Sequence, residues 1–175
     1  MAHDEAEAPS PQSAPDAILE AIERQRAASA ASPAEQERVP YLGFFLGSEV
    51  YGLPLDQLRE VARLTRLRRV PGAPRGVAGL VNLRGEIICA LDLRAILGLA
   101  GEQPADPGIL IALRGFSDPL GLVVDSIADV YSIDSGQIEP PPAAWPAERA
   151  ERFVGTARVP AGLMGLLDLN RVVEI

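Results

Sequence analysis

The chain has 175 residues, of which 47% are hydrophobic and 23% are charged, and its formal net charge is −8. This composition is typical of a globular protein, and the length allows one substantial core or two small cores that share an interface. Tight binding to nucleic acid requires many basic contacts with phosphates, so the acidic balance disfavours nucleic acid as the main partner.

Charge is distributed unevenly along the chain, and every basic residue in the Lys+Arg total of 16 is an arginine. Residues 41–100 contain eight arginines and five acidic residues, a net charge of +3, whereas residues 1–40 and 101–175 are both acidic. A basic middle segment of this kind can bind an acidic protein surface.

The chain contains one cysteine, Cys89, and one histidine, His3. These residues cannot form an intrachain disulfide or a Cys/His zinc site, and a lone histidine in the tail disfavours Ser-His-Asp and Cys-His catalysis. The acidic N-terminus does not resemble a signal peptide, and no apolar run approaches the roughly 20 residues that span a bilayer. We therefore expect a cytoplasmic protein that is neither exported by that route nor membrane-spanning.

Residues 1–40 are rich in Ala, Ser, Pro and Glu, a composition that predicts a flexible acidic extension. Within this extension, residues 16–28 predict a short helix with an apolar stripe at Ile18, Leu19 and Ile22. A helix of that length is marginally stable alone, which favours a nascent helix in a linker. The alternative is a helix that docks on the folded body.

From residue 41 onward, short apolar runs are separated by turns that contain Gly and Pro. Few windows have helical periodicity, so the pattern predicts an all-β protein made of barrels or sandwiches. Residues 93–97 and 169–173 each predict a short helical turn. The predicted strands span 41–46, 50–55, 61–70, 77–81, 86–91, 109–113, 120–124, 127–133, 153–159 and 163–167.

The same part of the chain contains an internal repeat. The first block, YGLPLDQLREV, aligns with LGLVVDSIADV, with Gly, Leu, Asp, an acidic residue and Val in register. The matched blocks are 51–61 with 120–130, Gly79 with Gly155, and 91–93 with 167–169.

The repeat predicts two copies of one small β unit, at approximately 41–104 and 105–175. Each copy is small for an independent core, so we expect the copies to bury apolar surface against each other. The predicted architecture is two small β-barrels in one inseparable body, with short helical turns and a mobile N-terminal extension.

Residues 82–86, NLRGE, predict a tight loop between two strands, with Gly85 free to adopt a positive φ. In one interpretation, Asn82 and Gly85 only make the turn and Arg84 is a solvated tip. In the other, a carboxylate holds the Arg84 guanidinium and presents it to a partner.

Three further features have a structural and a functional interpretation. Cys89 has no activating base in its local sequence, so we interpret it as a small buried hydrophobe rather than a nucleophile. Asp92 and Asp168 occupy the same repeat position before a short helical turn, which indicates helix N-caps rather than a carboxylate pair. We expect Trp145 to pin the loop around it onto a barrel rather than to anchor a partner.

Several motifs together resemble the CheW family of chemotaxis coupling proteins. The most specific is PGAP at 71–74 followed by GLVNLRGEII at 79–88. The resemblance covers residues 41–175 in collinear order, and it includes LREV at 58–61, LDLR at 91–94 and VDSIADV at 124–130. It implies two five-stranded SH3-like barrels related by the repeat, no catalysis and no cofactor.

Position by position, the resemblance implies that Glu60 and Arg84 lie close together near the receptor and kinase contact surfaces. Gly79 matches a glycine on the same edge. The sequence departs from the family pattern at Cys89, where proline is common, and its N–H predicts one more hydrogen bond in the strand. The predicted partner-binding residues are Glu60, Gly79, Asn82, Leu83, Arg84, Gly85, Val50 and Tyr51.

The resemblance implies an adaptor that joins the cytoplasmic tip of a chemoreceptor to CheA, a histidine kinase whose regulatory domain is CheW-like. We expect one barrel surface to bind that domain and the groove between the barrels to receive the receptor's helical hairpin. Such an adaptor would be cytoplasmic and recruited to membrane-associated receptor arrays. The alternatives are a CheW-like adaptor for type IV pilus motility or biofilm control and, from another class, a thiol enzyme that uses Cys89.

Overall fold

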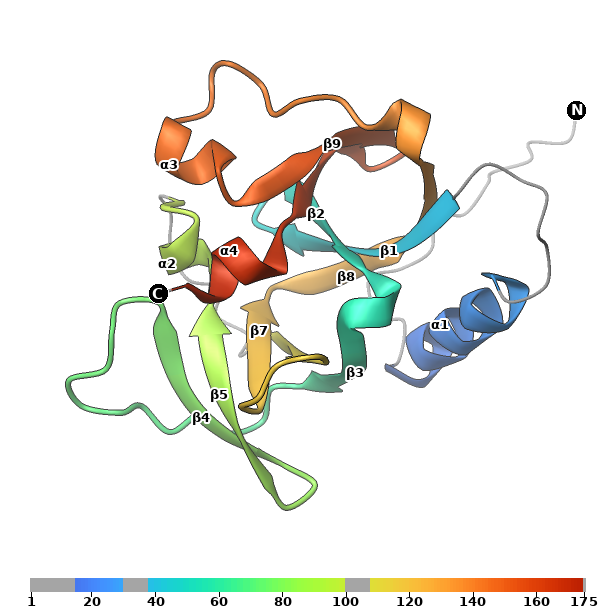
Figure 1. Ribbon diagram of the computed structural model, residues 1–175. Coiled ribbons are helices and arrows are strands. Elements are labelled where there is room, and N and C mark those ends of the chain that lie inside the picture. Colours follow the sequence, from blue (N-terminus) through green and yellow to red (C-terminus); the bar gives the residue numbers. More distant parts are fainter. Residues whose placement is uncertain (1–14, 30–37, 100–107, 175) are drawn as a thin grey trace, which may run out of the picture.

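The computed structural model describes residues 15–29, 38–99 and 108–174, and two five-stranded sheets form most of this part of the chain (Figure 1). The strands are β1 (Arg38–Leu46), β2 (Glu49–Pro54), β3 (Leu58–Arg63), β4 (Val77–Leu83), β5 (Glu86–Asp92), β6 (Ile109–Leu113), β7 (Leu120–Val124), β8 (Ser126–Asp134), β9 (Phe153–Val159) and β10 (Gly162–Leu167). The helices are α1 (Pro15–Ser29), α2 (Leu93–Ile96), α3 (Ala147–Ala150) and α4 (Leu169–Val173), with single 3₁₀ turns η1 (Leu55–Gln57) and η2 (Ser135–Gln137).

Each predicted strand has a counterpart, and the all-β class is confirmed. The strand predicted at 61–70 is displaced, because β3 ends at Arg63 and the following residues make only an isolated bridge from Arg68 to β4. Both predicted helical turns are present as α2 and α4. Their N-caps are confirmed, since the Asp92 carboxylate accepts a hydrogen bond from the amide of Ala95 and the Asp168 carboxylate caps α4 in the same way.

The two sheets combine strands from both halves of the chain. Barrel A has the order β8-β1-β2-β10-β9, and barrel B has the order β3-β6-β7-β5-β4. Each half therefore donates its first hairpin to the barrel that the other half's remaining strands form. The barrels do not coincide with the predicted copies 41–104 and 105–175, because turn signals identify a hairpin but not the sheet that it joins.

The repeat relates the two barrels strand by strand. Arg68 forms the bridge that closes barrel B against β4, and Glu139 forms the corresponding bridge that closes barrel A against β9. A Cβ on Gly155 would lie 2.6 Å from the carbonyl oxygen of Glu139, and a Cβ on Gly79 would collide with the carbonyl oxygen of Arg68. Glycine is needed at both repeat positions because two backbones approach closely there.

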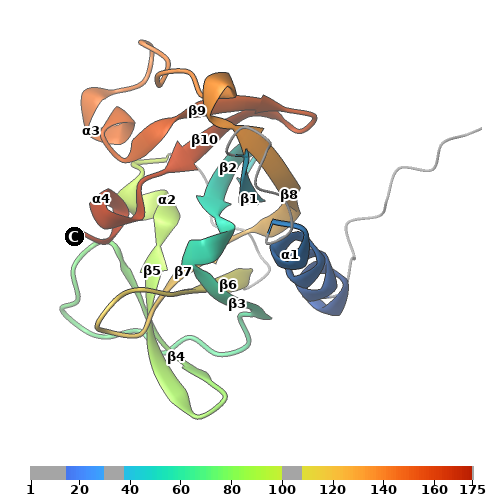
Figure 2. The same cartoon turned by 45° about the vertical axis from the view of Figure 1, so that its right-hand side comes forward.

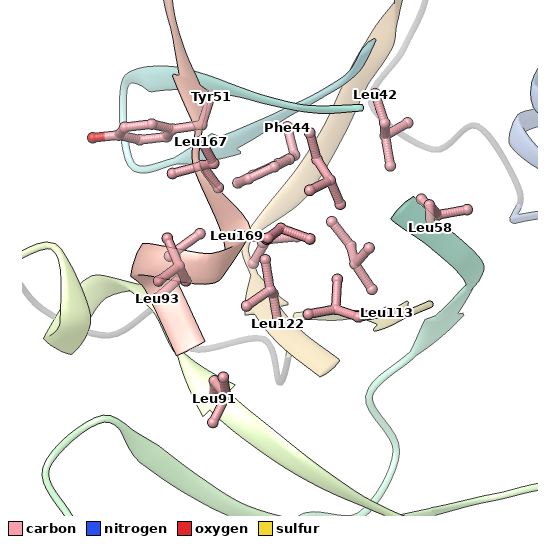
Figure 3. Close-up of a cluster of buried hydrophobic side chains, with 14 of the residues drawn as sticks. Leu42, Phe44, Tyr51, Leu58, Leu91, Leu93, Leu113, Leu122, Leu167 and Leu169 are labelled. Atoms are coloured by element: carbon pink, nitrogen blue, oxygen red, sulfur yellow. The ribbon is translucent and has the colours of Figure 1, made fainter. Parts of the chain in front are cut away.

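The hydrophobic core has one cluster inside each barrel and a larger one between the barrels. Ile88 and Ala90 lie inside barrel B, and their repeat equivalents Met164 and Leu166 lie inside barrel A. The cluster between the barrels draws on both halves, which confirms the predicted shared apolar face (Figure 3). Its labelled members in Figure 3 are Leu42, Phe44, Tyr51, Leu58, Leu91, Leu93, Leu113, Leu122, Leu167 and Leu169.

Helix α1 docks on this body, so the favoured interpretation of a nascent linker helix is wrong. Ile22 is only 1% exposed and belongs to the cluster between the barrels. The Arg26 guanidinium donates hydrogen bonds to the backbone oxygens of Leu55 and Leu58, at 3.0 and 2.7 Å. The expected flexibility of residues 1–14 and 30–37 concerns segments outside the described residues.

A mostly buried ion pair joins the barrels where the chain passes from β7 to β8. The Asp125 carboxylate binds the Arg94 guanidinium through both oxygens, with Nε 3.3 Å from Oδ1. It also accepts a hydrogen bond of 2.6 Å from the amide of Gly47, in the β1–β2 turn of barrel A. The two charged side chains are 16% and 18% exposed, so water screens this pair only weakly.

We predict that Asp125→Ala lowers the free energy of unfolding by about 3 kcal/mol, because it leaves the Arg94 guanidinium unpaired in a mostly buried position. Urea denaturation measures this loss. The matched control is Asp118→Ala, at an exposed position in the β6–β7 turn, and should change stability by less than about 0.5 kcal/mol. Equal effects of the two substitutions would show that the ion pair does not hold the barrels together.

Fragments 41–104 and 105–175, expressed separately, should be poorly folded, because neither contains all the strands of a barrel. Mixing the fragments should restore a folded complex, since both sheets can then be completed. NMR spectra of each fragment and of the mixture measure this outcome. A sharp, dispersed spectrum from either fragment alone would contradict the exchange of hairpins.

Candidate partner-binding site

The first element of the site is a β-bulge near the start of β3. The register of β3 with β6 shifts between Leu58 and Glu60, which inserts Arg59 as an extra residue. A bulge bends a strand and re-aims its side chains. Leu58 and Val61 are buried, whereas Arg59 and Glu60 between them are partly exposed. Two adjacent charged residues therefore reach the surface from one strand.

The second element is the β4–β5 hairpin, which projects from barrel B on the side away from barrel A (Figures 1 and 2). Its two turn residues, Arg84 and Gly85, have φ values of 53° and 90°. Positive φ at both positions is the geometry of a two-residue type I′ turn. The Asn82 side-chain oxygen accepts a hydrogen bond of 2.9 Å from the amide of Gly85. The predicted tight loop is confirmed, and it fixes the backbone of Arg84.

Two ion pairs connect the bulge to the hairpin. Arg84 Nε lies 3.4 Å from a carboxylate oxygen of Glu60, and Arg59 Nη2 lies 2.7 Å from a carboxylate oxygen of Glu86. The Arg84 side chain is 78% exposed, whereas that of Glu60 is 20% exposed. Exposed pairs of this kind contribute about 0–1 kcal/mol to stability. We call Arg59, Glu60, Arg84 and Glu86 the charged set.

The second copy provides an internal comparison for the charged set. Strand β8 has a register shift at the equivalent position, and β9 and β10 form the equivalent hairpin. At the equivalent positions of the second copy, three of the four residues are uncharged, and only Glu60 has a charged equivalent, Asp129. The equivalents of Arg59, Arg84 and Glu86 are Ala128, Pro160 and Gly162. The same bulge and hairpin therefore form without either ion pair, so the fold does not require the charged set.

The structure brings together some of the predicted partner-binding residues and separates others. Glu60, Asn82, Leu83, Arg84 and Gly85 lie at the bulge and hairpin of barrel B.

Val50 and Tyr51 lie elsewhere, in β2 of barrel A, where they are 3% and 1% exposed. Their side chains are part of the core, so they cannot present a contact surface. Gly79 is buried where barrel B closes, and the close approach of the Arg68 backbone gives this glycine a structural role. Its role as a contact position stays a prediction.

A second polar cluster, which the sequence did not reveal, holds the long loop before β9. Arg149 donates hydrogen bonds of 2.7 Å to the Glu49 carboxylate and to the Tyr51 hydroxyl, and its guanidinium carbon lies 4.5 Å from the centre of the Trp145 ring. Burial, followed by the hydrogen bond to Glu49, raises the pKa of Tyr51. The Trp145 ring packs against Phe153 in a tilted arrangement, with ring centres 4.8 Å apart and ring planes at 54°. Trp145 thus pins its loop onto barrel A, as predicted.

The surface around the charged set is basic and partly apolar. Ile87 is 54% exposed, and it shares the outer face of the hairpin with Leu80, since strand residues alternate between faces. Exposed arginines follow along the end of β3 and the segment that leads to β4. None of these forms an ion pair with a described residue: Arg63, Arg66, Arg68, Arg69 and Arg75. This surface is suited to an acidic partner with some apolar area.

Cys89 lies in β5, partly buried between β4 and β7. Its amide donates a hydrogen bond of 2.9 Å to the backbone oxygen of Pro119, which confirms the extra bond predicted for a residue other than proline. Burial, together with the negative charge of Asp118, raises the pKa of the thiol. The environment therefore disfavours the thiolate that a nucleophile requires.

The fold and the site define a double SH3-like barrel with an exposed, ion-paired hairpin, which is a module for binding other proteins. Residues 40–175 match the family model described as the CheW-like domain. The chain belongs to the CheW family. Among its described residues, no helix is long and apolar enough to cross a membrane.

Individual relatives are similar over most of the chain. A chemotaxis protein CheW from Helicobacter pylori is 30% identical, over 71% of this chain and 77% of the relative. A chemotaxis protein CheW from Klebsiella aerogenes is 28% identical, over 77% of this chain and 81% of the relative. The crystal structure of the scaffolding protein TtCheW from Thermoanaerobacter tengcongensis superposes with a TM-score of 0.71 at 26% identity, over 82% of this chain and 93% of that one.

Thiol labelling at increasing pH tests the environment of Cys89. Because the pKa of the folded thiol is raised, its thiolate fraction at pH 8 is lower than that of an unfolded cysteine. The folded protein should therefore react with iodoacetamide more slowly than the urea-unfolded chain, and its rate should rise at a higher pH. Rapid labelling of the folded protein at pH 7 would instead support the thiol-enzyme alternative.

Proposed function

We propose that this chain is a non-catalytic adaptor that couples chemoreceptors to the histidine kinase CheA. The observation that carries the proposal is the difference between the copies, which share a bulge and a hairpin but not the charged set. Residues that are exposed, held in place by the backbone and unnecessary for the fold have the properties of a binding site. Its membership of the CheW family supports the same conclusion.

The charge distribution supports a similar module as one partner. Barrel B contains the basic segment that follows β3, whereas residues 101–175 carry eleven acidic residues against five arginines. The hairpin of barrel B would contact the CheW-like regulatory domain of the kinase. Complementary electrostatic potentials on the two surfaces would favour one relative orientation. In this arrangement Arg84 is at the centre of the contact and the exposed Ile87 contributes apolar area.

The second partner is the helical cytoplasmic tip of a receptor. Helices are recognised through an apolar stripe laid on an apolar surface, and the apolar cluster at the barrel junction, against which α1 packs, would provide such a surface. A protein with these two partners would act in the cytoplasm and be recruited to membrane-associated receptor arrays.

Arg84→Ala should separate function from fold. The Glu60 pair is exposed, so the substitution should change stability by about 0–1 kcal/mol. A guanidinium at the centre of an interface contributes 2 kcal/mol or more, so assembly with the cognate receptor fragment and kinase should weaken by roughly thirtyfold. Thermal unfolding and a sedimentation assay of the ternary complex measure the two effects.

The matched control is Arg158→Ala, an exposed arginine on the β9–β10 hairpin of barrel A. This variant should melt and assemble like the wild type. If Arg84→Ala assembles as well as the control, the hairpin of barrel B is not the contact surface.

A further inference from the structure

Helix α1 covers the place where the two barrels meet. It packs against β3 of barrel B and against β1 and β8 of barrel A (Figures 1 and 2). Its inner stripe consists of Ile18, Ile22 and Arg26, one helical turn apart. Among its described side chains, Ile22 alone is fully buried. The structure therefore shows a helix already bound across the barrel junction.

The contact depends on features that another helix can reproduce. The acceptors for Arg26 are backbone oxygens of Leu55 and Leu58, at the turn formed by η1, so any suitably placed cation can bind them. The apolar part is the insertion of Ile22 into the cluster between the barrels, beside which Ile127 and Val130 of β8 also pack. The surface thus recognises two apolar residues four positions apart followed, four positions later, by a basic residue.

The opposite face of α1 makes no contribution to docking. Glu20 and Arg24 form an ion pair of 3.7 Å on that face, with side chains 74% and 77% exposed. A helix of 15 residues is marginally stable alone, so the position of α1 depends on the buried Ile22, the partly buried Ile18 and the Arg26 cation. Such a limited contact is suited to exchange.

We propose that α1 reversibly covers a helix-docking surface at the barrel junction and that a partner helix with the same stripe displaces it. The partner helix belongs to the receptor tip, a statement that rests on the proposed function. A binding surface that is free for only about a tenth of the time lowers the apparent affinity for its ligand by about tenfold. Helix α1 is thus an intramolecular competitor that sets the receptor affinity of the adaptor.

The experiment compares three full-length proteins: the wild type, Ile22→Asp, which releases α1, and Arg24→Ala, which changes only the exposed face. The probe is a fluorescently labelled helical-hairpin fragment of the cognate chemoreceptor tip, and fluorescence anisotropy measures its affinity. Ile22→Asp should bind the fragment about tenfold more tightly than the wild type, and Arg24→Ala should match the wild type. Equal or weaker binding by Ile22→Asp would overturn the proposal.

Two further measurements keep the test decisive. Arg26→Ala removes the cation without placing a charge in the core, so it should raise the affinity for the receptor fragment by a smaller factor than Ile22→Asp. This variant provides the test if Ile22→Asp unfolds the body. A labelled peptide of residues 15–29 should bind Ile22→Asp about tenfold more tightly than the wild type, whose surface is covered for most of the time. Absence of peptide binding to both proteins would overturn the inference. If the receptor fragment does not bind but the peptide binds as expected, the result would instead count against the receptor as partner in the proposed function.

Discussion

The apolar cluster between the barrels is the constraint on which the rest of the structure depends. Each half of the chain sends its first hairpin into the barrel of the other half, so neither barrel can form from one half alone. Residues such as Phe44 and its repeat equivalent Leu113 then meet in one cluster. Asp125 reinforces this arrangement where the chain passes from barrel B to barrel A, because its carboxylate binds both Arg94 and the amide of Gly47 in the β1–β2 turn.

A duplicated scaffold of this kind leaves one copy free to specialise. Both copies keep the bulge, the hairpin and the glycine at barrel closure, because these features determine the fold. Only the first copy has the full charged set, and Arg84 is held at a positive φ at the tip of its hairpin. We infer that the fold is maintained by the shared core and that partner recognition is carried by residues the core does not need.

Much of this architecture could be predicted from the sequence, because strands and repeats are local patterns. The strand predictions near β6, β7 and β9 have the observed bounds, and the pairing of Glu60 with Arg84 followed from the family resemblance. The exchange of hairpins could not be predicted, since it depends on the parallel contacts of β2 with β10 and of β5 with β7. The burial of Val50 and Tyr51 did have a signal: the run from 50 to 53 lacks alternation, as in a strand covered on both faces.

The partners of Arg26 and Arg149 were beyond prediction for a different reason. Arg26 binds backbone oxygens, which carry no sequence signal, and Arg149 pairs with Glu49 across 100 positions of the chain.

The central claim is that partners bind the bulge and hairpin of barrel B. Hydrogen exchange of the adaptor, alone and in the complex with receptor fragment and kinase, tests this claim most directly. The account predicts new protection at residues 58–60 and 82–87 and none at the equivalent hairpin, residues 158–163. Protection at 158–163, with 58–60 and 82–87 unchanged, would contradict it.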